Sequence, residues 1–268
     1  MSTREVGGRA RGYRRTGAGP PLVLLNGFAA TKDDWDPAFL DALAADHELV
    51  LLDHRGMGES ADGGGPFTVE DLADDAADAI DALELDRAAV LGWSMGGYVA
   101  LSLARRHPER VERLVLLSTT GGGELAMPGE EAIRGELRDT SGTPREQARR
   151  LISLLFPPAR AAAVDAQFGD VVARARAALS ADVTERQWAA MEAWERRPSA
   201  REDVGRISCP ALAATGDEDV VIPPENSLEL SKAIPGAWLA RFAGSGHGFI
   251  ADHPLELARL IAIFGRVT

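Results

Sequence analysis

A serine between glycines, a histidine in a glycine-rich loop and a run of carboxylates are the residues of this chain best suited to catalysis. The serine is Ser94, in the sequence Gly92-Trp93-Ser94-Met95-Gly96. A serine hydroxyl attacks a carbonyl group only when a base takes its proton, and that base is usually a histidine oriented by a carboxylate. Together these residue types predict acyl transfer through a covalent intermediate on the serine.

The best candidate for the base is His247. It lies in the loop Gly244-Ser245-Gly246-His247-Gly248, directly after a predicted strand, where the fold has no need of an imidazole. The other four histidines have structural explanations, because they flank a predicted strand or precede a proline at a helix end: His47, His54, His107 and His253. We therefore expect His247 to take the serine proton.

Three carboxylates follow the predicted strand Ala211–Thr215, and each is placed to orient a histidine. The sequence there is Gly216-Asp217-Glu218-Asp219. Functional groups gather at the carboxyl ends of strands in open α/β sheets, although aspartate is also common in turns. Position alone does not choose among the three.

Short apolar runs alternate with helical patterns along most of the chain. This alternation is typical of βαβ units, so it predicts an α/β fold with a mostly parallel central sheet flanked by helices. The predicted strands are Arg9–Arg15, Leu22–Leu25, Leu49–Leu52, Ala88–Gly92, Leu114–Leu117, Ala211–Ala214 and Trp238–Phe242. The predicted helices are Trp35–Leu43, residues 70–86, Tyr98–Arg106, Ser227–Ile234 and Leu255–Phe264.

These elements place Ser94 at a sharp turn between the strand that ends at Leu91 and the helix that starts near Tyr98. Such a turn strains the backbone of the serine and exposes its hydroxyl. It also needs glycines two residues to either side, because strand and helix must approach closely. The surrounding elements therefore strengthen the assignment of Ser94 as the nucleophile.

The alternation stops at Gly121-Gly122-Gly123, and residues 124–204 are rich in Ala and Arg, with helical spacing and no strand candidate. We expect a helical lid at residues 121–204, inserted into one domain formed by residues 1–120 and 205–268. Trp188 and Trp194 lie on one face of a predicted lid helix. They either line an apolar pocket or pack one lid helix against another, and the spacing does not decide between the two.

Five motifs, in this order, resemble those of the α/β-hydrolase superfamily. They are Leu24-Leu25-Asn26-Gly27-Phe28, Asp53-His54-Arg55-Gly56-Met57-Gly58-Glu59-Ser60, Gly92-Trp93-Ser94-Met95-Gly96-Gly97, Gly216-Asp217-Glu218-Asp219 with Ile222-Pro223, and Gly244-Ser245-Gly246-His247. The resemblance covers nearly all of the chain outside the lid. It implies the α/β-hydrolase fold and the chain order nucleophile, acid, histidine.

The resemblance also implies site residues. In this family the acid usually stands three residues after the glycine that ends its strand, which selects Asp219 and leaves Asp217 as the fallback. The backbone N–H groups of Phe28 and Met95 are the expected oxyanion hole. Asn26 stands where the family commonly has a histidine, so the shape of this loop and the substrate preference stay open.

The expected function is hydrolysis of a carboxylic ester or lactone, with a small-molecule acyl substrate and with no metal or other cofactor. Asn26, Trp93, Trp188 and Trp194 are the candidate pocket residues. The same architecture also hosts hydrolases that cleave carbon–carbon bonds of ring-cleavage diketones, and ligand-sensing proteins with weak turnover. These two remain the alternatives.

Composition excludes other classes of function. The chain has 268 residues and a net charge of −12, which argues against nucleic-acid binding. Residues 70–86 hold eight of the acids and no base, and we interpret them as a surface helix with a solvated acidic face.

A single cysteine, Cys209, and the absence of a secretory signal or an apolar run of about 18 residues predict a cytoplasmic protein that does not enter membranes. The composition does not indicate an oligomeric state.

Overall fold

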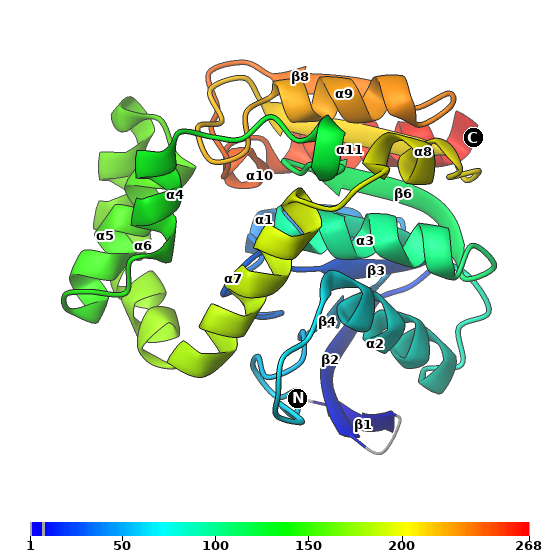
Figure 1. The fold of residues 1–268 in the computed structure, drawn as a ribbon, viewed down its shortest axis with the longest axis horizontal. Coiled ribbons are helices and arrows are strands. Elements are labelled where there is room, and N and C mark those ends of the chain that lie inside the picture. Colours follow the sequence, from blue (N-terminus) through cyan, green and yellow to red (C-terminus); the bar gives the residue numbers. More distant parts are fainter. Residues whose placement is uncertain (1, 7–8, 268) are drawn as a thin grey trace.

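The computed structural model describes residues 2–6 and 9–267, and it has an eight-stranded sheet with helices on both faces (Figure 1). The strand order is β1-β2-β4-β3-β5-β6-β7-β8. β4, β3 and β5 to β8 are parallel, whereas β2 pairs antiparallel with both β1 and β4. The predicted α/β fold with a mostly parallel sheet is therefore confirmed. Met1 and Thr268, the outer limits of the expected core segments, lie outside the described residues.

The strands are β1 (Ser2–Val6), β2 (Arg9–Gly17), β3 (Pro21–Leu25), β4 (Glu48–Leu52), β5 (Ala88–Trp93), β6 (Val111–Leu117), β7 (Ala211–Gly216) and β8 (Trp238–Phe242). Each predicted strand is present. β1 was not expected, because its Thr3, Arg4 and Glu5 are exposed and give no apolar signal.

Both faces of the sheet are buried, which explains why its inner strands are continuous apolar runs. Successive side chains of a strand point to opposite faces. Accordingly Leu22 and Leu24 of β3 pack into one hydrophobic cluster, while Val23 and Leu25 pack into the other. All four side chains are at most 1% exposed. The helices that complete the two clusters hold the sheet from both sides.

Helices of the core cover these faces. α1 (Pro37–Ala44), α10 (Phe249–Asp252) and α11 (Pro254–Val267) pack on the face that carries Leu22 and Leu24. α2 (Val69–Ala82), α3 (Met95–Arg106) and α9 (Glu225–Ala233) pack on the other. Thr68 and Asp71 form a capping box that starts α2.

The charge pattern suggested that α2 is a surface helix whose acidic face is solvated, but some of these acids are paired with basic side chains. Asp75 forms ion pairs with Arg11 and Arg55, and the Asp75 and Arg11 side chains are only 15% and 6% exposed. Asp74 pairs with Arg106 at the end of α3. Acids spaced along a helix face reach basic partners on neighbouring elements, and the sequence does not reveal those partners. Part of the acidic charge of α2 therefore anchors the helix.

Residues between β6 and β7 form helices only, in a stretch that the structure describes throughout. The elements are the 3-10 helix η1 (Gly123–Leu125), α4 (Glu131–Arg138), α5 (Pro144–Leu155), α6 (Pro158–Ala177), α7 (Ala181–Glu195) and α8 (Ala200–Gly205). Since β6 and β7 are hydrogen-bonded neighbours, this segment leaves and rejoins the sheet at adjacent strands. In Figure 1, α4, α5 and α6 stand beside the body of the sheet, and α7 leads back across it.

Of the helices that the structure describes, none is long and apolar enough to cross a membrane.

Candidate active site

Ser94 lies at the turn between β5 and α3, and its backbone has a strained conformation. Its φ of 57° and ψ of −122° fall in a region that residues other than glycine rarely adopt. The turn is held by hydrogen bonds of its own backbone, from Ser94 N to the carbonyl of Leu117 and from Gly97 N to the carbonyl of Ser94, both 2.9 Å long. Thr119 Oγ1 donates a further bond to the Ser94 carbonyl, at 2.8 Å.

The flanking glycines allow α3 to start directly after this residue. A Cβ atom on Gly92 would clash with the backbone of Gly96, and one on Gly96 would clash with the carbonyl oxygen of Leu25. These contacts bring the first turn of α3 against the end of β3. Ser94 therefore lies beside the loop that follows β3, and its backbone is at the N-terminus of a helix, where negative charge is favoured.

His247 and Asp219 are hydrogen-bonded to each other. His247 Nδ1 lies 2.8 Å from Asp219 Oδ2, and the two side chains are 3% and 0% exposed. A carboxylate only accepts, so Nδ1 carries a proton, and in the neutral ring Nε2 is then the nitrogen without one. The Trp93 ring, next to Ser94 in the chain, lies 5.3 Å from the His247 ring, and Trp93 Nε1 donates to the His247 carbonyl.

The three carboxylates after β7 have different partners, which the sequence left undecided. Asp219 Oδ1 accepts hydrogen bonds from the backbone of Val221 and Ile222, while its Oδ2 faces His247. Asp217 instead accepts from the Gly244 backbone, at 2.7 Å. Glu218 contributes its backbone N–H to the Ser245 carbonyl. Of these three carboxylates, the one bonded to the His247 ring is Asp219.

The helical insertion holds the loop that carries His247. Gly248 N donates to the carbonyl of Leu155, at the end of α5, over 2.8 Å. The adjacent Phe156 lies against Gly248, where a Cβ atom would come within 2.6 Å of its ring. Arg160 of α6 also pairs with Asp252, just beyond the loop. The position of His247 therefore depends on residues that are remote in the sequence.

The expected oxyanion groups lie on two neighbouring segments. A Cβ atom on Gly27 would be 3.2 Å from Ser94 Cβ, so the loop after β3 abuts the candidate nucleophile. Phe28 follows in this loop, and Met95 follows Ser94. Neither the Phe28 N–H nor the Met95 N–H donates a hydrogen bond to any other residue that the structure describes. Both groups are free to bind a negative oxygen.

Two buried side chains at this loop were not singled out from the sequence. His54 Nε2 lies 3.0 Å from the Asn26 carbonyl, and Gln187 Oε1 accepts a hydrogen bond from Ala29 N at 2.9 Å. Burial lowers the pKa of His54. From the sequence, His54 was expected to have a structural role only. No motif or spacing in the sequence indicates Gln187, which is far from this loop along the chain.

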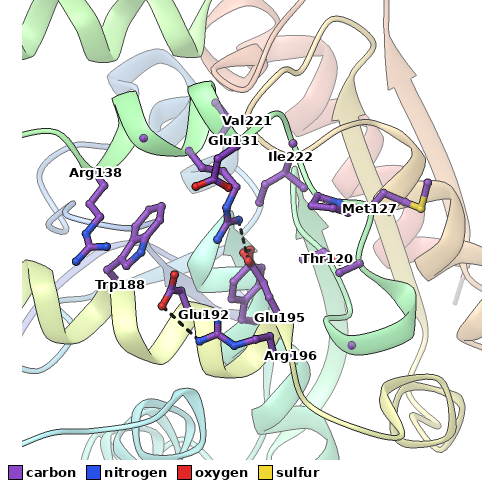
Figure 2. A pocket seen from close by; sticks show the side chains of 17 residues that line it. Thr120, Met127, Glu131, Arg138, Trp188, Glu192, Glu195, Arg196, Val221 and Ile222 are labelled. Carbon is purple, nitrogen blue, oxygen red and sulfur yellow. Dashed lines mark hydrogen bonds and ion pairs between the residues drawn. The ribbon is translucent and has the colours of Figure 1, made fainter.

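A cavity of about 520 Å³ lies between the insertion and the core. Its lining includes Tyr98 of α3, Trp188 of α7, and Val221 and Ile222, whose backbones hold Asp219. Figure 2 shows Trp188 and Arg138 on one side of it and Thr120 and Met127 on the other. Neither Ser94 nor His247 is among its lining residues, so this space adjoins the candidate catalytic groups without containing them.

Most of the charged side chains that line this cavity are paired, Glu131 being the exception among the described residues. Arg134 forms an ion pair of 2.7 Å with Glu195, which also accepts a hydrogen bond from the Tyr98 hydroxyl. Burial, reinforced by Glu195, raises the pKa of Tyr98 well above its usual value. The Arg134 and Arg138 guanidinium groups lie 5.4 and 5.8 Å from the centre of the Trp188 ring. The lining therefore combines these charges with apolar side chains, such as those of Met127 and Ile222, and with the aromatic surface of Trp188.

The four residues expected in a substrate pocket are in different places. Trp188 lines the cavity, whereas the other three are not among its lining residues. Trp194 is buried and stacks on Tyr98, Trp93 packs between Trp35 and His247, and Asn26 is 1% exposed. For Trp194, packing of helix against core is what the structure shows. No three His, Cys, Asp or Glu side chains within residues 2–6 and 9–267 are grouped so that they could hold a metal ion.

Comparison with known proteins gives the same architecture. The profile of a protein family described as the alpha/beta hydrolase fold matches residues 20–254. The enol-lactonase from Burkholderia xenovorans LB400 superimposes with a TM-score of 0.80 and 26% identity, over 98% of this chain and 99% of that one.

Two curated relatives are similar over most of their length. A protein of Azorhizobium caulinodans, provisionally named carbamate hydrolase RutD, is 29% identical over 90% of this chain and 89% of its own. The 2-hydroxymuconate semialdehyde hydrolase of Pseudomonas sp. CF600 is 30% identical over 93% of this chain and 88% of its own. All of these proteins are named for bond cleavage, although they differ in the bond.

Proposed function

The chain belongs to the α/β-hydrolase fold family and is a hydrolase, and from this premise we propose that it cleaves a carboxylic ester or lactone through an acyl-enzyme on Ser94. The observation that carries the proposal is the arrangement of three residues. Ser94 occupies a strained turn at the start of α3, and the His247 ring is fixed by its bond to the buried Asp219 carboxylate.

In the proposed reaction His247 Nε2 takes the proton from the Ser94 hydroxyl as its oxygen attacks the substrate carbonyl. The Phe28 and Met95 N–H groups bind the resulting oxyanion. His247 then gives the proton to the departing alcohol, which leaves an ester on Ser94. Water, deprotonated by the same imidazole, attacks that ester. The acid is released as His247 returns this proton to the Ser94 oxygen, while Asp219 keeps the proton on Nδ1 throughout.

We place residues 121–204 over this site as the lid, with residues 1–120 and 205–268 as the core. Support comes from the contacts of Leu155 with the His247 loop and of Gln187 with the loop after β3. The cavity beside Trp188 is the candidate space for the part of a small acyl substrate that lies away from the scissile bond. Its paired charges and aromatic wall favour a polar organic group over a long alkyl chain.

A carbon–carbon hydrolase is the second candidate. It is favoured by the 30% identity with the 2-hydroxymuconate semialdehyde hydrolase, which extends over 93% of this chain. Such an enzyme needs the same oxyanion site, so the bond between His247 and Asp219 does not distinguish the two reactions. A ligand-sensing protein with weak turnover is the third candidate, and it would differ from the two enzymes in its low turnover rate.

The proposal is tested by labelling and turnover together. A fluorophosphonate probe is expected to modify wild-type protein at Ser94, identified by mass spectrometry of the peptide, and to leave Ser94→Ala unmodified. Wild-type protein is expected to hydrolyse a short aryl ester, and Ser94→Ala to lose at least about 10³-fold in kcat. Ser102→Ala, a buried serine further along α3, serves as the matched control.

The outcomes separate the candidates. Wild-type protein that is neither labelled nor active contradicts a serine mechanism altogether. Labelling with very slow turnover of every substrate supports the sensor. Parallel assays with an aryl ester, a lactone and a vinylogous diketone then decide between ester or lactone hydrolysis and carbon–carbon cleavage.

A further inference from the structure

The loop after β3 has a conformation that needs support from outside. Ala29, the residue after Phe28, has a φ of 54°, in the left-handed region. Residues with a Cβ atom rarely adopt this conformation, because the Cβ atom comes too close to the following carbonyl oxygen. The Phe28 N–H lies in the peptide group between Gly27 and Phe28, and this group is joined at Phe28 Cα to the peptide group that carries the Ala29 N–H. Holding the Ala29 N–H in place therefore restricts the direction of the neighbouring Phe28 N–H. Whatever holds Ala29 therefore also orients the expected oxyanion donor.

One support comes from the core. His54 Nε2 lies 3.0 Å from the Asn26 carbonyl, which can only accept, so the ring donates. His54 follows β4, the strand next to β3 in the sheet. This bond fixes the start of the loop, and it leaves the end at Ala29 to be held by another group.

The other support comes from the insertion. Ala29 N donates to Oε1 of Gln187, a residue of α7 that is 0% exposed and 158 positions further along the chain. Because the backbone N–H is a donor, the orientation of this amide is determined. Its Nε2 must point away from Ala29, and it has no hydrogen-bond partner among the residues that the structure describes. Of the two ends of the Gln187 amide, Oε1 is therefore the one that makes a hydrogen bond.

Neighbouring residues of α7 keep Gln187 in place. Arg186 forms an ion pair of 2.7 Å with Asp62 and donates to the Gly65 carbonyl, which ties the helix to the loop before α2. On the other side, the Trp188 ring packs edge-on against Phe28, with 5.6 Å between the centroids. Three consecutive side chains therefore attach α7 to the core at the level of the loop.

We propose that Gln187 is a positioning residue for the oxyanion hole: by accepting the Ala29 N–H it holds the loop in the shape that directs the Phe28 N–H at the developing oxyanion. The inference rests on the proposed serine mechanism. It gives the inserted helix α7 a part in catalysis through the loop, without contact with the reacting atoms.

Two substitutions at Gln187 separate a hydrogen-bond role from a packing role. Gln187→Met keeps the volume and removes the acceptor. It is expected to lower kcat for an aryl ester about 10- to 100-fold with KM within about threefold of wild type, since misplacing a donor affects the transition state more than substrate binding. Gln187→Glu keeps an acceptor oxygen and replaces the unpartnered Nε2 with a second oxygen. Because the site is 0% exposed, we expect the carboxyl group to be neutral at pH 6, and this variant to stay within about threefold of wild type.

A boronic acid supplies the second readout, because its adduct with Ser94 places an oxygen in the oxyanion hole. Its inhibition constant is expected to rise with Gln187→Met by about the factor lost in kcat. Gln147→Met, in an exposed part of the same insertion, is the control and is expected to change neither quantity. Melting temperatures of all variants report whether the fold is retained.

The result that overturns the inference is an active, labelled wild-type protein whose Gln187→Met variant keeps its kcat and its affinity for the boronic acid. Equal losses in folded Met and Glu variants also overturn it, because packing alone would then explain the effect. If the Met variant folds poorly, a large loss of kcat in a folded Glu variant, which keeps the acceptor, still contradicts the inference. A wild-type protein without turnover or Ser94 labelling instead contradicts the proposed function, and with it the role of Gln187.

Discussion

Asp219 illustrates how much of the site depends on single hydrogen bonds. One of its carboxylate oxygens is held by two backbone N–H groups and the other by His247 Nδ1. Both oxygens are thus occupied, and the side chain has one orientation. The imidazole it binds therefore has one tautomer as well.

Replacing Asp219 with asparagine is expected to lower kcat by about 10³- to 10⁴-fold, because an amide in that position can donate to Nδ1 and so favours the wrong tautomer. The measurement is kcat for an aryl ester, with circular dichroism to confirm folding. Asp217→Asn is the matched control, since Asp217 binds the Gly244 backbone rather than His247, and it is expected to stay within about threefold of wild type. A larger loss in the Asp217 variant would reverse the assignment of the acid.

The residues of the candidate site differ in how readily they can be predicted from the sequence. Ser94 and His247 stand in glycine-rich motifs, and the chemistry of a serine nucleophile names the partner it needs. Asp219 could be separated from Asp217 only by resemblance to a family, because both follow the same strand. Gln187 carries no local signal, since its role exists only when α7 is docked on the loop at Ala29.

At the scale of elements, the turn from β5 to α3 is the most demanding connection. The glycines at 92 and 96 permit contacts that any side chain would prevent. They also explain why α3 begins at Met95 and not near Tyr98, as the helical pattern indicated. Glycine is a poor helix former, so Gly96 and Gly97 concealed the first turn of this helix, which tertiary contacts stabilise.

A pair of glycine substitutions tests this reading. Gly96→Ala is expected to lower the free energy of unfolding by about 3 kcal/mol, because its Cβ atom would clash with the Leu25 carbonyl. Gly135→Ala, within α4, has no atom within 4 Å of the new Cβ, and it is expected to raise the free energy by about 0.5–1 kcal/mol. Urea denaturation measures both, and equal effects of the two substitutions would contradict the argument.

Most other elements could be predicted from the pattern of apolar residues in the sequence, because strands buried on both faces are continuous apolar runs. The exceptions are elements without that pattern. Within residues 2–6 and 9–267, the edge strand β1 pairs with β2 alone, and its Thr3, Arg4 and Glu5 are exposed. α10 is a single short turn of four residues. The ion pairs of Asp75 with Arg11 and Arg55 also join elements that are far apart in sequence, which charge patterning cannot reveal.

For the whole molecule, the stability at mildly acidic pH depends on His54. Burial lowers its pKa below the usual value of 6.5, although the charges of Asp53 and Asp75 partly oppose this. The unfolded chain then binds a proton on this residue at a higher pH than the folded protein does. The contribution of neutral His54 to stability is therefore complete above about pH 6.5 and declines as the pH falls through the lowered pKa.

The expected consequence is a melting temperature that falls more steeply between pH 7 and pH 5 in wild-type protein than in His54→Gln, which keeps an N–H donor but does not titrate. Differential scanning calorimetry across this range measures the two slopes. Since the remaining histidines are common to both proteins, they cancel in the comparison. Parallel slopes would show that His54 is protonated at the same pH in the folded and unfolded chains.

The insertion between β6 and β7 has a consequence for recombining this fold with its relatives. Its two ends meet at neighbouring strands, so a foreign segment could be spliced there without disturbing the sheet. A functional chimera would nevertheless have to bring its own acceptors for the Gly248 and Ala29 N–H groups, which Leu155 and Gln187 now supply. If Gln187 positions the oxyanion hole as we propose, a graft chosen only for the shape of its pocket would lack catalytic activity even where it folds.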